Sequence, residues 1–337
     1  MRSRAFIAGC SGLRLTAEER AFFAASAPWG FILFARNVET PDQVRGLVEE
    51  LRAAVGWQAP VLIDQEGGRV QRLRPPHWHD DPPAEAFGTL YLRDPQAALT
   101  AVRLNSQAIA ADLMDLGIDV DCLPVADLRH PDGHGIIGNR AYGTTPEAVA
   151  ALAREAAAGL LDCGVLPVLK HIPGHGRAPA DSHERLPVVT ADRAALEAAD
   201  FEAFRRLRGL PLAMTAHVVY AAIDPERPAT TSAMMINEVI RSFIGFDGLL
   251  MSDDLSMGAL AGDLGSRSRA AIAAGCDLLL HCNGKMEEME PVAEAAPALD
   301  GLAADRAARA LALREGTVRA DPAGLRAEVR RLLDAGA

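Results

Sequence analysis

The chain has 337 residues, of which 49% are apolar and 23% charged, as in an ordinary globular protein with ample material for a core. The formal net charge of -11, together with scattered arginines, argues against nucleic acid or an anionic membrane surface as a partner. The chain has no run of about 18 apolar residues, the length needed to span a bilayer. Its five cysteines follow no regular spacing, which indicates reduced thiols and a cytoplasmic location.

Short apolar runs recur along the chain, and each is followed by a helical pattern. In order they cover residues 5–10, 30–35, 60–64, 118–127, 165–171, 212–217, 248–254 and 276–282. Continuous apolar runs are typical of strands covered on both faces, and their alternation with helices indicates parallel pairing. Eight such units close most economically into a barrel. We therefore predict an α/β fold with one domain, a (β/α)8 TIM barrel over residues 1–337.

Helix starts agree with this interpretation. Capping boxes begin at Thr16 and Thr40, and helical patterns also open at Thr145 and Thr190. The segment after Glu287 is typical of closing helices. The main competitor is an open doubly wound sheet, but no glycine-rich dinucleotide fingerprint or phosphate loop follows an early strand.

Polar residues follow the predicted strands at or just beyond their carboxyl ends. In a barrel of this kind the carboxyl ends of the strands meet at one rim, where active sites are built. The residues so placed are Asp64, Glu66, Arg69, Arg72, Asp127, Arg140, Lys170, His171, His217, Ser252, Asp253, Asp254, His281 and Asn283.

The loop that follows the fifth predicted strand is rich in groups that carry protons. The stretch "KHIPGHGRAPADSHERLP" holds three histidines, with Asp181 two residues before His183. A carboxylate at that spacing can bond one ring nitrogen and favour the protonated imidazole. Such a histidine gives and takes protons near neutral pH. The best candidate nucleophile lies elsewhere, in the pair Asp253 and Asp254.

Five stretches in matching order resemble the successive signatures of family 3 glycoside hydrolases. They are "LIDQEGGRVQRL", "IIGNRAYG", "VLKHIPGHG" with "ADSH", "MTAHVVY" and "LLMSDDLSMGAL", and the likeness runs from about residue 5 to 283. The chain is most similar to the single-domain bacterial β-N-acetylglucosaminidases of cytoplasmic peptidoglycan recycling. It differs from the usual sequence of these motifs at Ile172, where phenylalanine is frequent, and at Asn139, where aspartate is frequent.

The resemblance implies a role for particular residues. It implies that Asp253 is the nucleophile of a retaining exo-β-N-acetylglucosaminidase and that His183, paired with Asp181, is the acid/base. The substrate implied is terminal GlcNAc on muropeptides (GlcNAc-1,6-anhydroMurNAc-peptides), with no metal or organic cofactor, and we expect a monomer. Glycines and prolines around His183 suit a loop that closes after sugar binds. The sugar-binding positions implied are Asp64, Arg72, Arg140, Lys170 and His171.

Without the resemblance, each motif has a plainer structural interpretation. Asp253 and Asp254 can cap a strand, the Asp181–His183 pair can be an exposed loop contact, and the charged strand-end residues can form a salt-bridge network at the rim. We expect His171 to contact sugar and His175 to be structural, while His217 can either shape the site or be a satisfied core histidine.

Other functions stay open at this point. One is a family 3 β-glycosidase of different specificity, for chitooligosaccharides or β-glucosides. A second is a metal-dependent barrel hydrolase, because His171, His175, Asp181 and His183 carry suitable ligand atoms, although their spacing matches no metal signature. A third is a sugar-binding protein without catalysis, against which the presence of both Asp253 and His183 argues.

Overall fold

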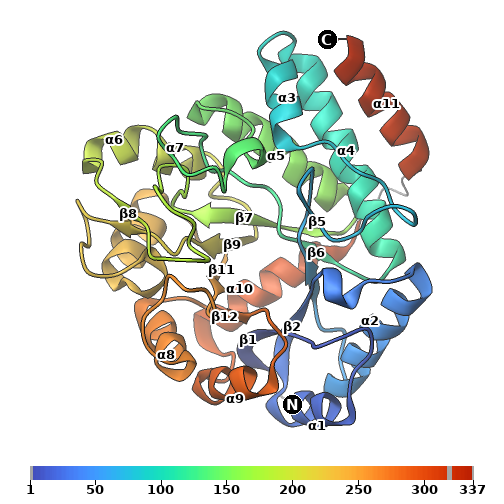
Figure 1. The fold of residues 1–337 in the computed structure, drawn as a ribbon, viewed down its shortest axis with the longest axis vertical. Coiled ribbons are helices and arrows are strands. Elements are labelled where there is room, and N and C mark those ends of the chain that lie inside the picture. The colour runs from blue at the N-terminus through green and yellow to red at the C-terminus, as the bar shows by residue number, and fades with distance from the viewer. Residues whose placement is uncertain (1–2, 317–320, 336–337) are drawn as a thin grey trace.

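The computed structural model describes residues 3–316 and 321–335, and within them eight parallel strands close into a barrel (Figure 1). The strands are β1 (Arg4–Gly9), β2 (Pro28–Leu33), β3 (Val61–Ile63), β6 (Val120–Asp121), β7 (Leu166–Ile172), β9 (Leu212–Thr215), β11 (Leu249–Asp254) and β12 (Leu278–His281). Their order around the barrel is β1-β12-β11-β9-β7-β6-β3-β2. Each overlaps one predicted apolar run, so the predicted (β/α)8 barrel is confirmed.

Helices surround the strands (Figure 1). The α-helices are α1 (Ala17–Ser26), α2 (Pro41–Val55), α3 (Ala84–Tyr91), α4 (Pro95–Asp115), α5 (Pro146–Asp162), α6 (Arg193–Ala198), α7 (Asp200–Arg205), α8 (Leu264–Ala274), α9 (Met286–Ala295), α10 (Gly301–Leu311) and α11 (Pro322–Ala335). A π-helix, η4 (Met235–Phe243), lies between β9 and β11, and α11 packs against α4 (Figure 1). No helix in the described part of the chain is long and apolar enough to cross a membrane.

Most of the predicted helix starts are confirmed, and one is wrong. Thr16, Thr40 and Thr145 each accept a hydrogen bond from a backbone amide in the first turn of their helix. Of the two predicted capping boxes, that of Thr16 is complete, whereas the Gln43 side chain accepts from the Glu39 amide and not from the Thr40 amide. Thr190 does not begin α6. Asp192 does so instead, because its carboxylate accepts a 2.8 Å hydrogen bond from the Ala195 amide.

The core has two parts because side chains alternate along each strand. On β1, Ile7 points into the barrel and Phe6 points out toward the helices; on β12, Leu280 and Leu279 alternate in the same way. All four side chains are buried, and full burial of one such side chain stabilises the fold by about 1.5–3 kcal/mol. Because apolar side chains fill the barrel interior, a ligand must bind at its end.

Short strands outside the barrel order two of its loops. The connection from residue 65 to 88 holds an antiparallel pair, β4 (Gln65–Gly67) and β5 (Val70–Gln71), and the first turn of α3. A second pair, β8 (Val188–Val189) and β10 (Val219–Tyr220), is parallel. All five cysteines are buried and free, as expected for reduced thiols.

Candidate active site

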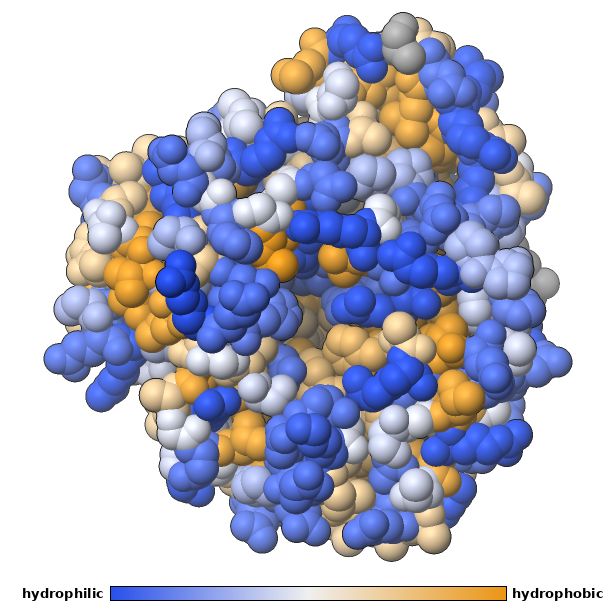
Figure 2. Space-filling model, viewed as in Figure 1, coloured by the Kyte–Doolittle hydropathy of each residue, from blue (hydrophilic) through white to orange (hydrophobic). Residues whose placement is uncertain are grey.

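A cavity of about 340 Å³ lies at the carboxyl ends of the barrel strands. On the face in Figure 2, hydrophilic residues border a central hollow with apolar atoms at depth. Asp181, one of the eight predicted site residues, does not line this cavity but bonds to His183, which does. The structure thus brings the predicted set together around one cavity, and the seven that line it are Asp64, Arg72, Arg140, Lys170, His171, His183 and Asp253.

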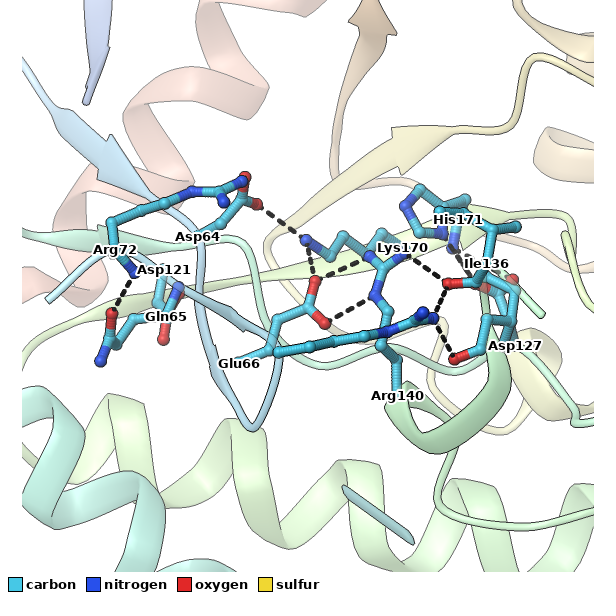
Figure 3. Close-up of polar contacts among 12 residues, drawn as sticks. Asp64, Gln65, Glu66, Arg72, Asp121, Asp127, Ile136, Arg140, Lys170 and His171 are labelled. Carbon is cyan, nitrogen blue, oxygen red and sulfur yellow. Dashed lines mark hydrogen bonds and ion pairs between the residues drawn. The ribbon is translucent and has the colours of Figure 1, made fainter. Parts of the chain in front are cut away.

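Charged side chains of alternating sign form a continuous row beside the cavity (Figure 3). At its centre, the Nζ atom of Lys170 lies 2.9 Å from Oδ1 of Asp64 and 2.6 Å from Oε1 of Glu66. Arg72 donates a 2.8 Å hydrogen bond to Asp64, and Arg140 donates two bonds of 2.8 Å to Glu66. The salt-bridge network of the plainer interpretation is therefore present, and its members also face the cavity.

Pairing keeps this row ionised despite its burial. Burial works to raise the pKa of Asp64, but the charges of Lys170 and Arg72 outweigh it and hold that pKa below its usual range. Burial likewise opposes the charge on Lys170, yet the two carboxylates raise its pKa. A row fixed in this way presents carboxylate acceptors and cationic donors in set positions, which suits recognition of sugar hydroxyls.

Asp127 anchors two histidines beneath the cavity. Its Oδ2 atom lies 2.7 Å from Nδ1 of His171, and its Oδ1 atom accepts a 2.6 Å hydrogen bond from the His175 amide. Burial works to raise the pKa of Asp127, while the attraction of His171 lowers it to a net value below the ordinary one. Since Nδ1 of His171 faces Asp127, its other ring nitrogen is left for the cavity that it lines.

His175 lies under the loop and outside the cavity lining. Its Nε2 atom is 3.1 Å from the hydroxyl of Ser182, and its ring packs edge-on to His171 with centroids 5.8 Å apart. Burial, helped by the neighbouring His171, lowers the pKa of His175 to about 4. The ring is therefore neutral at neutral pH, and it has a structural contact as expected from the sequence.

The predicted dyad is formed at the mouth of the cavity. Nδ1 of His183 lies 2.8 Å from Oδ1 of Asp181, which also accepts a 2.9 Å hydrogen bond from the His183 amide. The His183 side chain is 64% exposed, so the ring is open to solvent. With Nδ1 directed at the carboxylate, Nε2 is the ring atom left to exchange a proton.

The two adjacent carboxylates at the end of β11 differ in their surroundings. Asp254 accepts hydrogen bonds from the amide and hydroxyl of Ser256, at 3.0 and 2.7 Å, and from the Cys282 amide at 3.2 Å. Asp253 accepts one bond from the other described residues, 2.8 Å from the Asp254 amide, and it lines the cavity. The carboxylate of Asp254 thus stabilises the local fold, whereas one carboxylate oxygen of Asp253 accepts no hydrogen bond from the described residues.

The charge of Asp253 is stabilised by its neighbours. Burial works to raise its pKa, but the imidazoles of His217 and His171 and the Asp254 amide lower it below the ordinary value. His217 is fixed by bonds of 2.7 Å to the Thr230 hydroxyl and 3.0 Å to the Asp254 carbonyl. His217 therefore supports the end of β11 from beneath.

Glu66 and Phe34 take part in the site but were not among its predicted catalytic or sugar-binding residues, although Glu66 was expected at the rim. Glu66 joins Lys170 to Arg140, and its place two residues after Asp64 at a strand end was the only signal for it. Phe34 lines the cavity between two guanidinium groups, those of Arg36 and Arg72, each 5.1 Å from its ring centroid. Aromatic stacking of this kind leaves no mark in the sequence pattern.

A metal centre finds no support in this arrangement. In residues 3–316 and 321–335, no group of three or more His, Cys, Asp or Glu side chains is placed to hold a metal ion. His171 is paired with Asp127, and His183 with Asp181.

A closed parallel barrel with a charged cavity at the carboxyl ends of its strands is the architecture in which TIM-barrel enzymes build their active sites. The model for the family described as "Glycosyl hydrolase family 3 N terminal domain" matches residues 10–312. A β-hexosaminidase of Alkalilimnicola ehrlichii is 44% identical over 282 residues, which cover 82% of this chain and 79% of that protein. The chain therefore belongs to glycosyl hydrolase family 3, and it is a glycoside hydrolase.

Solved structures agree with this assignment. NagZ from Neisseria gonorrhoeae in complex with N-trifluoroacetyl-D-glucosamine has a TM-score of 0.87 and 31% identity, covering 100% of this chain and 99% of that one. The same gonococcal protein in complex with zinc ion has a TM-score of 0.86 with equal identity and coverage. The likeness thus extends over the full length of both chains.

Proposed function

We propose that the chain is a retaining exo-β-N-acetylglucosaminidase that removes terminal non-reducing β-GlcNAc from muropeptides in cytoplasmic peptidoglycan recycling. In this proposal residues 1–337 act as one catalytic domain and as a monomer. The observation that carries it is the placement of Asp253 and His183 in the lining of one cavity. A carboxylate and a proton donor at one cavity are the minimum set for retaining hydrolysis.

In the first step, the carboxylate of Asp253 attacks the anomeric carbon while Nε2 of His183 donates its proton to the glycosidic oxygen. The bond to the leaving group breaks as the bond to Asp253 forms, which gives a covalent glycosyl-enzyme. In the second step, neutral His183 takes a proton from water, whose oxygen attacks the anomeric carbon and releases Asp253. Asp181 stabilises the imidazolium at the beginning and the end of this cycle.

The charged row orients the sugar in the proposed complex. Asp64 accepts hydrogen bonds from hydroxyl groups, while Arg72, Arg140, Lys170 and His171 donate to the sugar oxygens. Because each of these side chains is already held by a neighbour, binding orders few of them further, and less conformational entropy is lost.

Relatives support a substrate with an N-acetylated amino sugar. The similar chain from Alkalilimnicola ehrlichii is a β-hexosaminidase, and the gonococcal NagZ was solved with N-trifluoroacetyl-D-glucosamine. The muropeptide aglycone rests on the resemblance to the single-domain recycling enzymes. The alternative is a family 3 glycosidase for chitooligosaccharides or β-glucosides, and substrate competition separates the two.

The mechanism is tested by mass spectrometry after reaction with a slow, fluorinated GlcNAc-type glycosyl donor. The expected result is a glycosyl adduct on the peptide that contains Asp253, absent from Asp253→Ala treated in parallel. An adduct on another residue, or a first-formed sugar of inverted configuration, refutes the mechanism. For the substrate, kcat/KM on GlcNAc-1,6-anhydroMurNAc is compared with chitobiose and aryl β-glucoside, and preference for either of the latter refutes the muropeptide proposal.

A further inference from the structure

The loop that carries the dyad is held at both ends by its own neighbours. At its beginning, the His175 amide is bonded to Asp127 at 2.6 Å. At its end, the Pro187 carbonyl accepts a 3.0 Å hydrogen bond from the Val219 amide, next to the β8–β10 pair. The dyad lies between these anchors, so its position depends on what holds the middle of the loop.

The middle is held through Ser182, the residue between the two dyad members. Ser182 is only 3% exposed, whereas His183 projects into solvent. Its hydroxyl lies 3.1 Å from Nε2 of His175, and its carbonyl accepts a 3.1 Å hydrogen bond from the Ala259 amide. The next carbonyl, that of His183, accepts a 3.2 Å bond from the Gly258 amide.

Gly258 has a specific reason to lack a side chain. A Cβ atom at this position would lie 2.9 Å from the carbonyl oxygens of both His183 and Glu184, closer than real Cβ contacts. The φ of Gly258 is outside the left-handed region, so alanine is allowed by the backbone and the restriction is purely one of space. The two loops touch because this residue is glycine.

These contacts join the proton donor to the segment that bears the nucleophile. Gly258 and Ala259 follow Asp253 after one turn, in which the Met257 amide donates a 3.2 Å hydrogen bond to the Asp254 carbonyl. Met257 itself lines the cavity. A shift of this turn therefore moves the support of His183 relative to Asp253.

We propose that Ser182 and Gly258 are positioning residues for the reaction and that they hold His183 at the mouth of the cavity through the Ser182–His175 contact and the two amide bonds. The inference rests on the proposed roles of Asp253 and His183. Loss of the contact leaves the nucleophile intact and reduces the fraction of complexes in which the proton donor is in place. Poor leaving groups, which need the proton, then suffer more than good ones.

The test uses Ser182→Ala and Gly258→Ala in the full chain, with matched controls elsewhere. Ser268→Ala removes a buried hydroxyl that bonds within its own helix, and Gly209→Ala adds a Cβ where no atom lies within 4 Å. Values of kcat/KM are measured on aryl β-GlcNAc substrates of graded leaving-group pKa. We expect both loop variants to lose about 10- to 100-fold on the poorest leaving groups and little on the best, while the controls match wild type.

Hydrogen exchange of the backbone amides of residues 255–262 measures the contact between the two loops independently of enzyme activity. The amides of Gly258 and Ala259 are bonded to the dyad loop, so Ser182→Ala is expected to speed their exchange relative to wild type and to Ser268→Ala. If these amides exchange at the wild-type rate in both loop variants, the contact between the two loops is refuted. If they exchange faster but kcat/KM is unchanged, the positioning role of the contact is refuted.

His183→Ala, measured in parallel, separates this inference from the proposed function. Equal losses across all leaving groups in that variant overturn the acid role of His183, and the positioning role falls with it. If His183→Ala loses activity in a leaving-group-dependent way but both loop variants behave as their controls, the proposed function stands and the positioning inference alone is refuted.

Discussion

The Nζ atom of Lys170 lies 2.6 Å from Oε1 of Glu66, and the lysine is only 2% exposed. It also contacts Asp64 at 2.9 Å, so one buried cation bridges two carboxylates. Removing it leaves Asp64 with Arg72 and Glu66 with Arg140 as their remaining partners in a region with little water, which is more costly than losing a surface ion pair.

Lys170→Met is therefore expected to lower the free energy of unfolding by about 1–3 kcal/mol, as measured by urea denaturation. The matched control is Arg45→Met, which removes a cation that also contacts two carboxylates, Asp42 and Asp115, but at the exposed surface. We expect the control to leave the unfolding midpoint almost unchanged. Equal effects in the two variants contradict a structural role for the buried row.

Asp253→Ala is expected to reduce turnover of aryl β-GlcNAc by at least roughly 1,000-fold without unfolding the protein. Asp254→Ala removes the bonds to Ser256 and Cys282 instead, so its main effect is expected in the thermal unfolding midpoint. Near-normal rates for Asp253→Ala, measured with circular dichroism as the check on folding, exclude Asp253 as the nucleophile.

Asp181→Asn retains an oxygen for the His183 contact but removes the negative charge. Because that charge stabilises the imidazolium that donates the proton in the proposed first step, its loss is expected to slow substrates with poor leaving groups most. The value of kcat/KM is therefore expected to fall by roughly 10-fold on an aryl β-GlcNAc with a poor leaving group and by less on one with a good leaving group. Wild-type values of kcat/KM on both substrates contradict the dyad.

His175 gives a pH dependence of stability whose sign is fixed by its lowered pKa of about 4. In the unfolded chain the ring binds a proton near pH 6.5, so the unfolded state takes up more protons as pH falls. Its contribution, at most about 3 kcal/mol, is present above pH 6.5 and is lost as pH falls toward 4. His175→Gln is expected to flatten the decline of stability over this window in urea titrations, whereas exposed His134→Gln is not.

Chelation tests the metal-dependent alternative directly. With no ligand group placed for a metal among the described residues, prolonged treatment with EDTA followed by desalting is expected to leave aryl β-GlcNAc turnover unchanged. A loss of activity that added zinc restores supports the metal-dependent hydrolase instead.

The barrel and the position of its active-site rim could be predicted because parallel strands all have their carboxyl ends on the same side of the sheet. Eight apolar runs predict the barrel strands, and parallel strands carry the residues at their carboxyl ends to one rim, which is why Asp64, Lys170 and Asp253 meet. The roles proposed for them come from the likeness to family 3. Helix starts were less certain where two capping residues compete, as Thr190 and Asp192 do.

Contacts that depend on side-chain direction were beyond the sequence. Asp253 and Asp254 are neighbours of the same type and both line the cavity, and only their hydrogen bonds show that Asp254 is bonded to Ser256 and Cys282 while Asp253 accepts a single bond from the described residues. The insertion of Glu66 between Lys170 and Arg140 depends on a short hairpin that brings three separate segments together. No spacing rule encodes such a meeting.

Asp127 accepts bonds both from the His171 ring and from the backbone of His175 where the dyad loop begins. In the proposed mechanism, this one carboxylate orients His171, which binds the sugar, and also holds the start of the loop that carries the proton donor. Any substitution at Asp127 must disturb affinity and proton delivery in concert, so engineering that seeks to change one without the other has to look to different positions.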